Sequence, residues 1–236
     1  FIFLIPCLSF AQSNPVGPAR YDNTWLNGYC NGCGDTLFGG TVMNFNVYPP
    51  SVSSGEVDVA FYITNSNFSN AFGNLVALTN GYYIGNASYD TMPGGDSINS
   101  LDYGVYQDIL PQGTLFLPQP GNDSIIYLIH EQSSLNPVVV PYSFVYLAHY
   151  SIINILANNG QGEVVNKNIS LLQDTLCYGK LTAVKHGNGR DWWFVIPAYN
   201  QPLYYKFLLT PNGIDTFPPQ LIGGPSYSSL GQAVFA

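Results

Sequence analysis

GKLTAVKHGNGRDWWFVIPAYNQPLYYKFLLTPNGI, residues 179–214, contains the clearest structural pattern in this chain. Apolar and polar positions alternate in three successive runs, which predict strands at Leu181–Lys185, Asp191–Pro197 and Tyr204–Thr210. Asn188-Gly189 separates the first two runs, and this pair tolerates the positive φ angles that a tight hairpin turn needs. The stretch therefore predicts an antiparallel meander.

The opening pattern of this meander, a Gly followed by alternating apolar positions, recurs along the chain. At intervals of roughly 73, 66 and 52 residues, it begins at Gly40, Gly113, Gly179 and Gly231. Apolar runs that close with a Gly turn recur too, at 78–81, 157–160 and 210–213. Repeats of four short strands are typical of propeller blades. We expect an all-β fold, a partial and truncated β-propeller with about three antiparallel blades and the start of a fourth.

The segments between these landmarks fit the same architecture. Residues 57–86 predict two or three strands around a turn at 70–74 and a hairpin signal at Asn80-Gly81. A whole blade is expected from Gln112 to Leu172. Its strands are predicted near Thr114–Leu117, Ile125–His130, Phe144–Leu156 and Glu163–Leu172.

The first residues, FIFLIPCLSFA at 1–11, form an apolar run that is shorter than the roughly 20 residues of a membrane span. We interpret them as a signal peptide that lacks its basic start and is cleaved before Gln12; the alternative is a hydrophobic N-terminal strand. The expected division is then a signal peptide at 1–11, a lead-in segment at 12–39 and the partial propeller at 40–236. No later run predicts a membrane span. The chain begins without Met and stops within an expected strand, so we expect a longer parent protein.

Composition supports an extracellular β protein. Aromatic residues make up 15% and charged residues 8% of the 236 residues, with 24 Gly and 17 Pro, which favours many short strands and turns. The net charge is −8, and residues 21–166 contain no Lys or Arg. Nucleic acids and anionic membranes need a basic surface, so neither is an expected partner. The simplest interpretation of the acidic charge is that it keeps an exported protein soluble.

Cys30 and Cys33 have the C-x-x-C spacing of redox motifs and of half a zinc site. A zinc site needs a second ligand pair, which Cys177 and three scattered His do not supply at a recognisable spacing. A redox motif would need a βαβ context, which the sequence lacks. We therefore interpret Cys30 and Cys33 as a candidate local disulfide in an exported protein. Cys177 is then expected to be unpaired and buried.

Catalytic motifs were sought without success. His130-Glu131 is followed by Ser134 where the zinc-protease pattern H-E-x-x-H requires a second His. Phosphate-binding loops and dinucleotide fingerprints are also missing from the sequence. We therefore assign no catalytic, cofactor-binding or metal-binding residue and expect no cofactor. A carboxylate pair for glycoside hydrolysis stays open, because its members need only meet in space.

The most enzyme-like group of residues is His186, Asn188, Arg190 and Asp191. One interpretation makes His186 a general base that Asp191 orients. The other is a structural turn cluster whose side chains bond backbone groups, while Trp192 and Trp193 pack on opposite faces of the strand. We favour the structural interpretation.

KLTAVKHGNGRDWW at 180–193 resembles a segment of large secreted proteins from gliding and related Bacteroidota. Further matches are at 73–81, 92–96, 112–115 and 231–235, and residues 9–12 look like the usual signal cleavage region of that group. The family typically joins an N-terminal propeller-like region to a C-terminal sorting domain for type IX secretion, or to a gliding-motility-associated C-terminal domain. The resemblance implies type IX export and C-terminal domains that follow the present chain. It supplies no catalytic residues.

These observations predict a secreted or cell-surface module for recognition or adhesion, without catalysis, that binds an extracellular glycan or protein. One alternative is an enzyme that acts on polysaccharide in the propeller funnel. Another is a structural spacer without a ligand. A hydrolase should show inward-facing acids beside aromatic platforms, whereas a binding module may show exposed aromatic side chains without a buried carboxylate pair.

Overall fold

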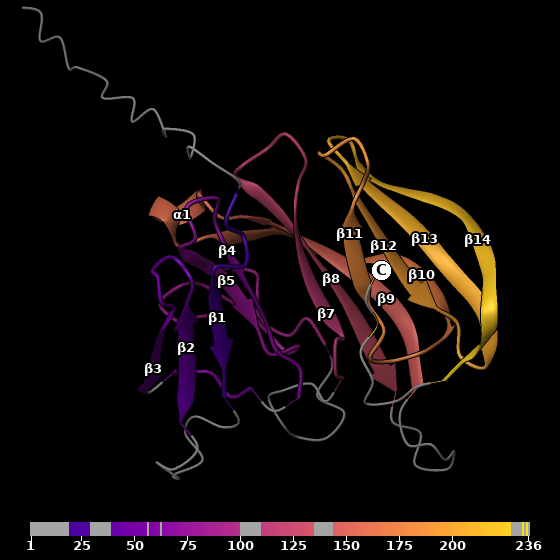
Figure 1. Ribbon diagram of the computed structural model, residues 1–236, viewed down its shortest axis with the longest axis horizontal. Helices are drawn as coiled ribbons and strands as arrows, with labels where there is room; N and C mark the ends of the chain where they lie inside the picture. Colours follow the sequence, from indigo (N-terminus) through magenta and orange to yellow (C-terminus); the bar gives the residue numbers. More distant parts are fainter. Residues whose placement is uncertain are drawn as a thin grey trace, which may run out of the picture.

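A computed structural model describes residues 19–28, 39–55, 57–61, 63–99, 110–134, 144–227, 233 and 235. These residues form four antiparallel sheets, each built from strands that follow one another in the chain (Figure 1). The prediction of an all-β fold is therefore confirmed. The helical content of the described part is the short turn α1 (Ala157–Gly160), and none of it could cross a membrane as a helix. The predicted signal peptide at 1–11 lies outside the described residues.

The sheets are named A to D in chain order. Sheet A contains β1 (Thr24–Asn27), β2 (Gly40–Asn44) and β3 (Ser51–Gly55). Sheet B contains β4 (Ser66–Ser69), β5 (Leu75–Thr79) and β6 (Ile84–Gly85). Sheet C contains β7 (Thr114–Pro118), β8 (Ile125–Ser134), β9 (Phe144–Asn154) and β10 (Glu163–Leu176). Sheet D contains β11 (Thr182–Lys185), β12 (Trp192–Pro197), β13 (Gln201–Thr210) and β14 (Gly213–Ser226).

The predicted strands of sheets C and D are confirmed to within a few residues. The main difference is β14, the fourth strand of sheet D, which was not predicted. A smaller difference is β9, which ends at Asn154 rather than Leu156. The chain turns directly afterwards, where Asn158 and Asn159 have φ angles of 50° and 58°. Asn adopts this left-handed region more readily than most residues, so the turn is encoded locally.

Sheet A differs from the predicted organisation. Gly40 was expected to open a blade, but it begins β2, the middle strand of a sheet whose first strand is β1. β1 lies within the predicted lead-in at 12–39 and pairs with β2 from Thr24↔Asn44 to Asn27↔Thr41. The proposed boundary at residue 39 therefore crosses a hydrogen-bonded sheet. Alternation in β1 extends over only four residues, which is too short to stand out in the sequence.

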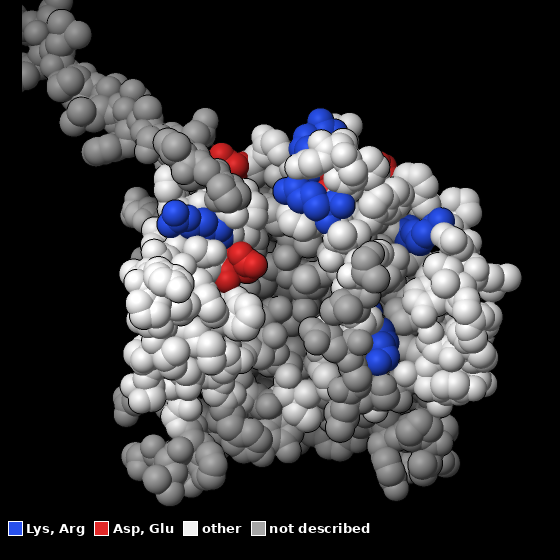
Figure 2. Space-filling model, in the orientation of Figure 1, with Lys and Arg blue, Asp and Glu red and all other residues white. Residues whose placement is uncertain are grey.

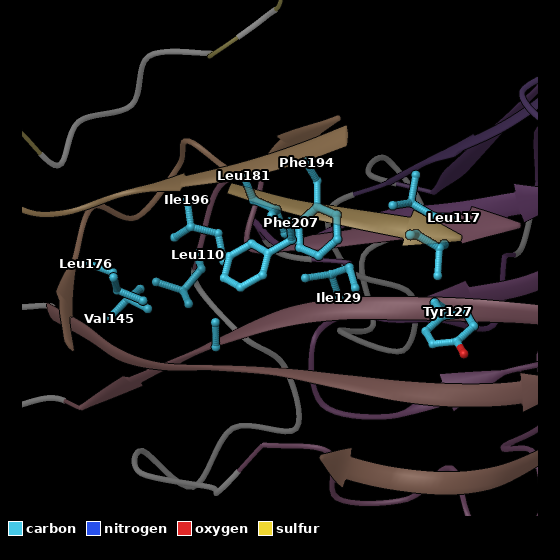
Figure 3. Packing of buried hydrophobic residues seen from close by; sticks show 12 residues of the cluster. Leu110, Leu117, Tyr127, Ile129, Val145, Leu176, Leu181, Phe194, Ile196 and Phe207 are labelled. Atoms are coloured by element: carbon cyan, nitrogen blue, oxygen red, sulfur yellow. The ribbon is translucent and has the colours of Figure 1, made fainter. Parts of the chain in front are cut away.

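A hydrophobic core lies between sheets C and D. The rings of Phe194 on β12 and Phe207 on β13 stack with their centroids 5.0 Å apart. Figure 3 shows both rings beside Ile129, which β8 contributes from the facing sheet. These side chains are at most 1% exposed, and the burial of each contributes about 2 kcal/mol.

The opposite face of sheet C packs against sheet B in a second core. Successive side chains of a strand point to opposite faces, so Ile126 and Leu128 lie in this core while Tyr127 and Ile129 lie in the first. Sheet B contributes Phe68, among others. Sheet C is therefore buried on both faces, which explains the nearly continuous apolar sequence of β8.

A third core joins sheet A to sheet B through Leu26, Leu78 and Phe61. The sheets thus pack face to face in chain order, A on B, B on C and C on D. Figure 1 shows this order from the indigo to the yellow end of the molecule. The outer face of sheet D has no described sheet packed against it.

The strands β4 and β7 approach each other with the same chain direction. The Thr64 hydroxyl exchanges two hydrogen bonds of 2.9 Å with the backbone of Leu110. Two residues later, the Ser66 hydroxyl donates to the carbonyl of Thr114 over 3.1 Å. Residue numbers therefore increase together on the two strands, which run parallel.

The strands β1 and β4 run in opposite directions. The backbone amide of Thr24 donates to the Ser69 hydroxyl over 3.3 Å, and that of Leu26 donates to the Asn67 side chain over 3.0 Å. Numbers rise on β1 while they fall on β4. The relation between sheets A and B consequently differs from that between sheets B and C.

Candidate functional site

The four residues of the predicted turn cluster lie together at the hairpin between β11 and β12. The Asn188 side-chain oxygen accepts from the backbone amides of Arg190 and Asp191, at 3.0 Å each. Its amide nitrogen donates to the Asp191 carboxylate over 2.8 Å. The turn requires the left-handed φ of 72° at Gly189, so a side chain there would be strained.

The Asp191 carboxylate is hydrogen-bonded to Arg190 rather than to the His186 ring. His186 and Asp191 are instead joined through the backbone, where the His186 amide donates to the Asp191 carbonyl over 2.8 Å. The Arg190 guanidinium donates from Nε over 2.7 Å and from Nη2 over 3.1 Å. These bonds, followed by that from Asn188, lower the pKa of the Asp191 carboxyl. The His186 Nδ1 instead accepts from the backbone amide of Asn188 at 3.0 Å. The alternative in which Asp191 orients a His186 base therefore has no hydrogen bond between the carboxylate and the imidazole to support it among the described contacts.

The two tryptophans that follow the hairpin point to opposite faces of sheet D. Trp192 packs on the core between sheets C and D, with the Lys185 ammonium 4.3 Å from its ring centroid. Trp193 lies on the outer face, where its ring meets His186 and Phe217 at centroid distances of 5.7 and 5.0 Å. The hairpin thus joins the core to an aromatic outer face.

Cys177 is a buried free thiol, as the sequence predicted. Burial, followed by the nearby charge of Glu131, raises its pKa to about 11. A thiol with a raised pKa is a weak nucleophile, so Cys177 does not mark a reactive site. Cys30 and Cys33, the predicted local disulfide, lie outside the described residues.

A large concave site of the described residues lies on the outer face of sheet D. We call it the end-face hollow. Its volume is ≈ 800 Å³, within the range of about 300–1,000 Å³ that small ligands occupy. Its floor consists of the sheet residues Thr182, Val195, Tyr204, Lys206, Gln220 and Ile222. Its rim includes Lys180, Tyr227 and Phe235.

Strand register explains how this floor is assembled. Thr182 faces Val195, Val195 faces Lys206, and Lys206 faces Phe217, so these four form one row across β11 to β14. Residues directly opposite each other in antiparallel strands point to the same side of the sheet. The neighbouring row contains Tyr204 and Gln220. The side chains between these rows, Ile196 and Tyr205, point the other way into the core.

The polar groups of the hollow are few and are held in place. The Tyr204 and Ser226 hydroxyls are 3.1 Å apart, and the Lys206 ammonium donates to the Gln220 side chain over 3.2 Å. Among the described lining residues there is no Asp or Glu. The hollow therefore offers apolar and aromatic surface, hydrogen-bonding groups and two cations.

A second, polar group of residues is enclosed between sheets B and C. His130 on β8 is fully buried, faces Thr114 on β7 and His149 on β9, and its Nε2 is 3.3 Å from the Ser151 hydroxyl. Burial and then His149 lower the pKa of His130 to about 3, and burial lowers that of His149. His130 is closed to substrates, whereas His149 is only partly buried. Within the described part of the chain, no set of three His, Cys, Asp or Glu side chains is placed to hold a metal ion.

Comparison with known proteins gives no relative for this site. No protein-family model, curated protein or solved structure matches the chain. The resemblance to secreted Bacteroidota proteins stays a prediction. The function must therefore be argued from the residues themselves.

Proposed function

We propose that this chain is a recognition module without catalysis and that it binds an extracellular glycan in the end-face hollow. The observation that supports this function most directly is the lining: aromatic and apolar side chains surround a few polar groups, and no described carboxylate is among them. Sugars present apolar C–H faces and hydroxyl groups together, which matches such a lining. Sites for small ligands generally combine a largely apolar wall with a few polar groups that fix orientation.

The proposal includes a propeller architecture in which sheets B, C and D act as blades. Three features support it: each sheet is a meander, the sheets stack face to face, and β4 and β7 run parallel on the inner side. β11 has a similar place, because Leu181 at its start shares a core with Leu110, and Lys185 at its end lines a groove with Pro118. Sheet A departs from the pattern through β1.

The rival enzyme would need two carboxylates that flank a glycosidic bond, at about 5–10 Å from each other. Two acids of the described part are buried, Glu131 and Asp191. Glu131 is at 0% exposure within the sheet stack and cannot reach a polymer. Asp191 is hydrogen-bonded to Arg190 and Asn188 in the hairpin. This favours recognition over hydrolysis. The aromatic hollow likewise favours recognition over a spacer.

The cellular setting completes the proposal. The apolar run at 1–11 and the resemblance of 180–193 support a protein that is exported to the cell surface or the medium. Type IX export and C-terminal domains that follow this chain rest on the resemblance alone. In that setting the module would hold its parent protein on a glycan or a protein partner.

A glycan array probed with the full chain, with turnover of every bound glycan measured in parallel, tests the function. We expect binding without cleavage. Tyr204→Ala removes an aromatic wall of the hollow and should weaken binding at least about tenfold, which corresponds to a loss of about 1.4 kcal/mol. Tyr48→Ala is the matched control, because Tyr48 is 98% exposed and lies outside the hollow.

Two results would contradict the proposal. Cleavage that disappears when one acid is replaced would establish the rival enzyme. Silence in both assays would leave the spacer or a protein ligand.

A further inference from the structure

The charge of Lys206 is out of place on its sheet face. Its neighbours across the strands are Val195 and Phe217, and its neighbours on the same side of β13 are Tyr204 and Leu208. A solvent-exposed sheet face would be polar throughout, and a face built only to pack on another sheet would exclude a central ammonium, since burying an unpaired charge is costly. Lys206 also meets Gln220, and Asp215 lies opposite Leu208 on the same face. This face therefore mixes a cation with apolar and polar side chains and fits neither case.

A second cation, Lys180, lines the same hollow. The chain contains six Lys and Arg against fourteen Asp and Glu, so two of six basic side chains gather at one site of an acidic protein. Figure 2 shows how thinly charged side chains are spread over the face that it presents. No described carboxylate is in the lining, so the charged side chains that line the hollow are both basic.

We propose that the end-face hollow selects an acidic polysaccharide, whose uronic-acid carboxylates pair with Lys206 and Lys180 while its sugar rings pack against Val195 and Tyr204. The inference rests on the proposed glycan recognition and adds the class of ligand. The Lys206 ammonium is already fixed beside Gln220, which leaves its other two N–H groups to donate to a carboxylate. Hydrogen bonds between ionised partners are about twice as strong as neutral ones.

The test compares polygalacturonate oligomers with their methyl esters, which keep the sugar but lose the charge. Binding is measured by titration calorimetry on the full chain. We expect the acid to bind about tenfold more tightly than the ester, and Lys206→Gln and Lys180→Gln each to remove about tenfold of the affinity for the acid alone. Raising the salt concentration should weaken binding of the acidic oligomer and leave binding of the methyl ester unchanged.

Lys167→Gln is the matched control. It causes the same change in net charge on β10 of sheet C, where Lys167 pairs with Asp96 at 3.5 Å outside the hollow. Circular dichroism of each variant shows that the fold is kept. We expect Lys167→Gln to bind both oligomers as the unchanged chain does.

Several results would overturn the inference. Equal affinity for acid and ester, with no effect of Lys206→Gln, would leave glycan recognition standing and refute the selection of charge. An equal loss with Lys167→Gln would assign the effect to net charge, and tighter binding of a sulfated polymer would refute the carboxylate. Binding of no glycan at all, with a dimer in sedimentation, would refute the proposed function too and make the face a contact between copies.

Discussion

His130 combines complete burial with a nitrogen that has no hydrogen-bond partner. Its Nε2 lies near Ser151, whereas its Nδ1 is buried and unpaired. The ring lies 5.6 Å from that of His149, between their centroids. A charged imidazolium would have no counter-ion among the described residues on this side of β8, so His130 is held neutral at pH 7. His130 therefore makes the folded core sensitive to acid.

This arrangement predicts that stability falls with pH in a defined window. The pKa of His130 is lowered from 6.5 to about 3, so the unfolded chain takes up a proton below pH 6.5 and the folded chain does not until about pH 3. The contribution of His130 to the free energy of unfolding should be fully present above pH 6.5. Below that pH, the free energy of unfolding should fall by up to about 1.4 kcal/mol per pH unit. Urea unfolding between pH 7.5 and 5 measures this slope.

His130→Leu should flatten the slope, with His149 contributing the remainder. His186→Gln is the control, since His186 lies in the hairpin outside the cores. A slope that is unchanged in His130→Leu would show that other groups carry the pH dependence.

At the scale of the element, the hairpin between β11 and β12 is fixed by one side chain. Asn188 makes three hydrogen bonds, two from backbone amides and one to Asp191. Without them the amides of Arg190 and Asp191 would depend on water. The Asn188 side chain therefore stabilises the conformation of this hairpin loop.

We expect Asn188→Ala to lower the free energy of unfolding by about 1 kcal/mol, because partly exposed hydrogen bonds each contribute about 0.5 kcal/mol or less. Hydrogen exchange of the Arg190 and Asp191 amides should accelerate in parallel. Asn212→Ala, in the hairpin between β13 and β14, is the control, because its side chain has no hydrogen bond with the described residues. Equal effects of the two substitutions would contradict a special role for Asn188.

How far the elements could be predicted depends on what alternation reveals. It locates β12 and β13 well, because Trp192–Pro197 and Tyr204–Thr210 are long and bounded by turn residues. It does not reveal which side of a strand faces the core. On β13, Tyr204 and Leu208 are as apolar as Tyr205 and Leu209, and Lys206 against Phe207 is the single difference between the two faces, so the position of sheet C decides between them. The end-face hollow was missed for that reason.

The same limit applies to the failed H-E-x-x-H pattern. His130 and Glu131 are adjacent on a strand, so their side chains point to opposite faces of sheet C. His130 faces sheet B, while Glu131 lies near Cys177 toward sheet D. The metal-binding pattern requires a helix, on which its two His share one face. Only the assignment of His130 and Glu131 to a strand shows that their side chains point to opposite faces.

For the molecule as a whole, sheet C is the shared wall of two cores. Leu128 and Ile129 are adjacent, both fully buried, and lie in different cores. A cavity on either side therefore removes support from the same sheet. We infer that sheets B, C and D unfold together.

Leu128→Ala and Ile129→Ala should each cost about 2–4 kcal/mol, and both should shift the whole transition. The informative readout is tryptophan fluorescence in a Trp25→Phe background, where the signal comes from Trp192 and Trp193 of sheet D. Leu128→Ala lies in the distant core, yet should move this signal as far as Ile129→Ala does. The control is Val165→Ala, at a side chain that is 53% exposed. If Leu128→Ala leaves the unfolding transition of sheet D unchanged, the sheets unfold as independent units.

The opposed direction of β1 gives the array of sheets a polarity. From sheet B to sheet C the facing strands β4 and β7 keep the same chain direction. From sheet B to sheet A the facing strands β4 and β1 run in opposite directions. A tandem gene duplication of one four-stranded unit could be accommodated beside sheet D, where a copy would meet a neighbour of matching direction. If the same copy were inserted between sheets A and B, its strand facing β1 would run in the opposite direction to β1. The parallel relation of sheets B and C would not be repeated there. Sheet A thus departs from the relation that sheets B and C share.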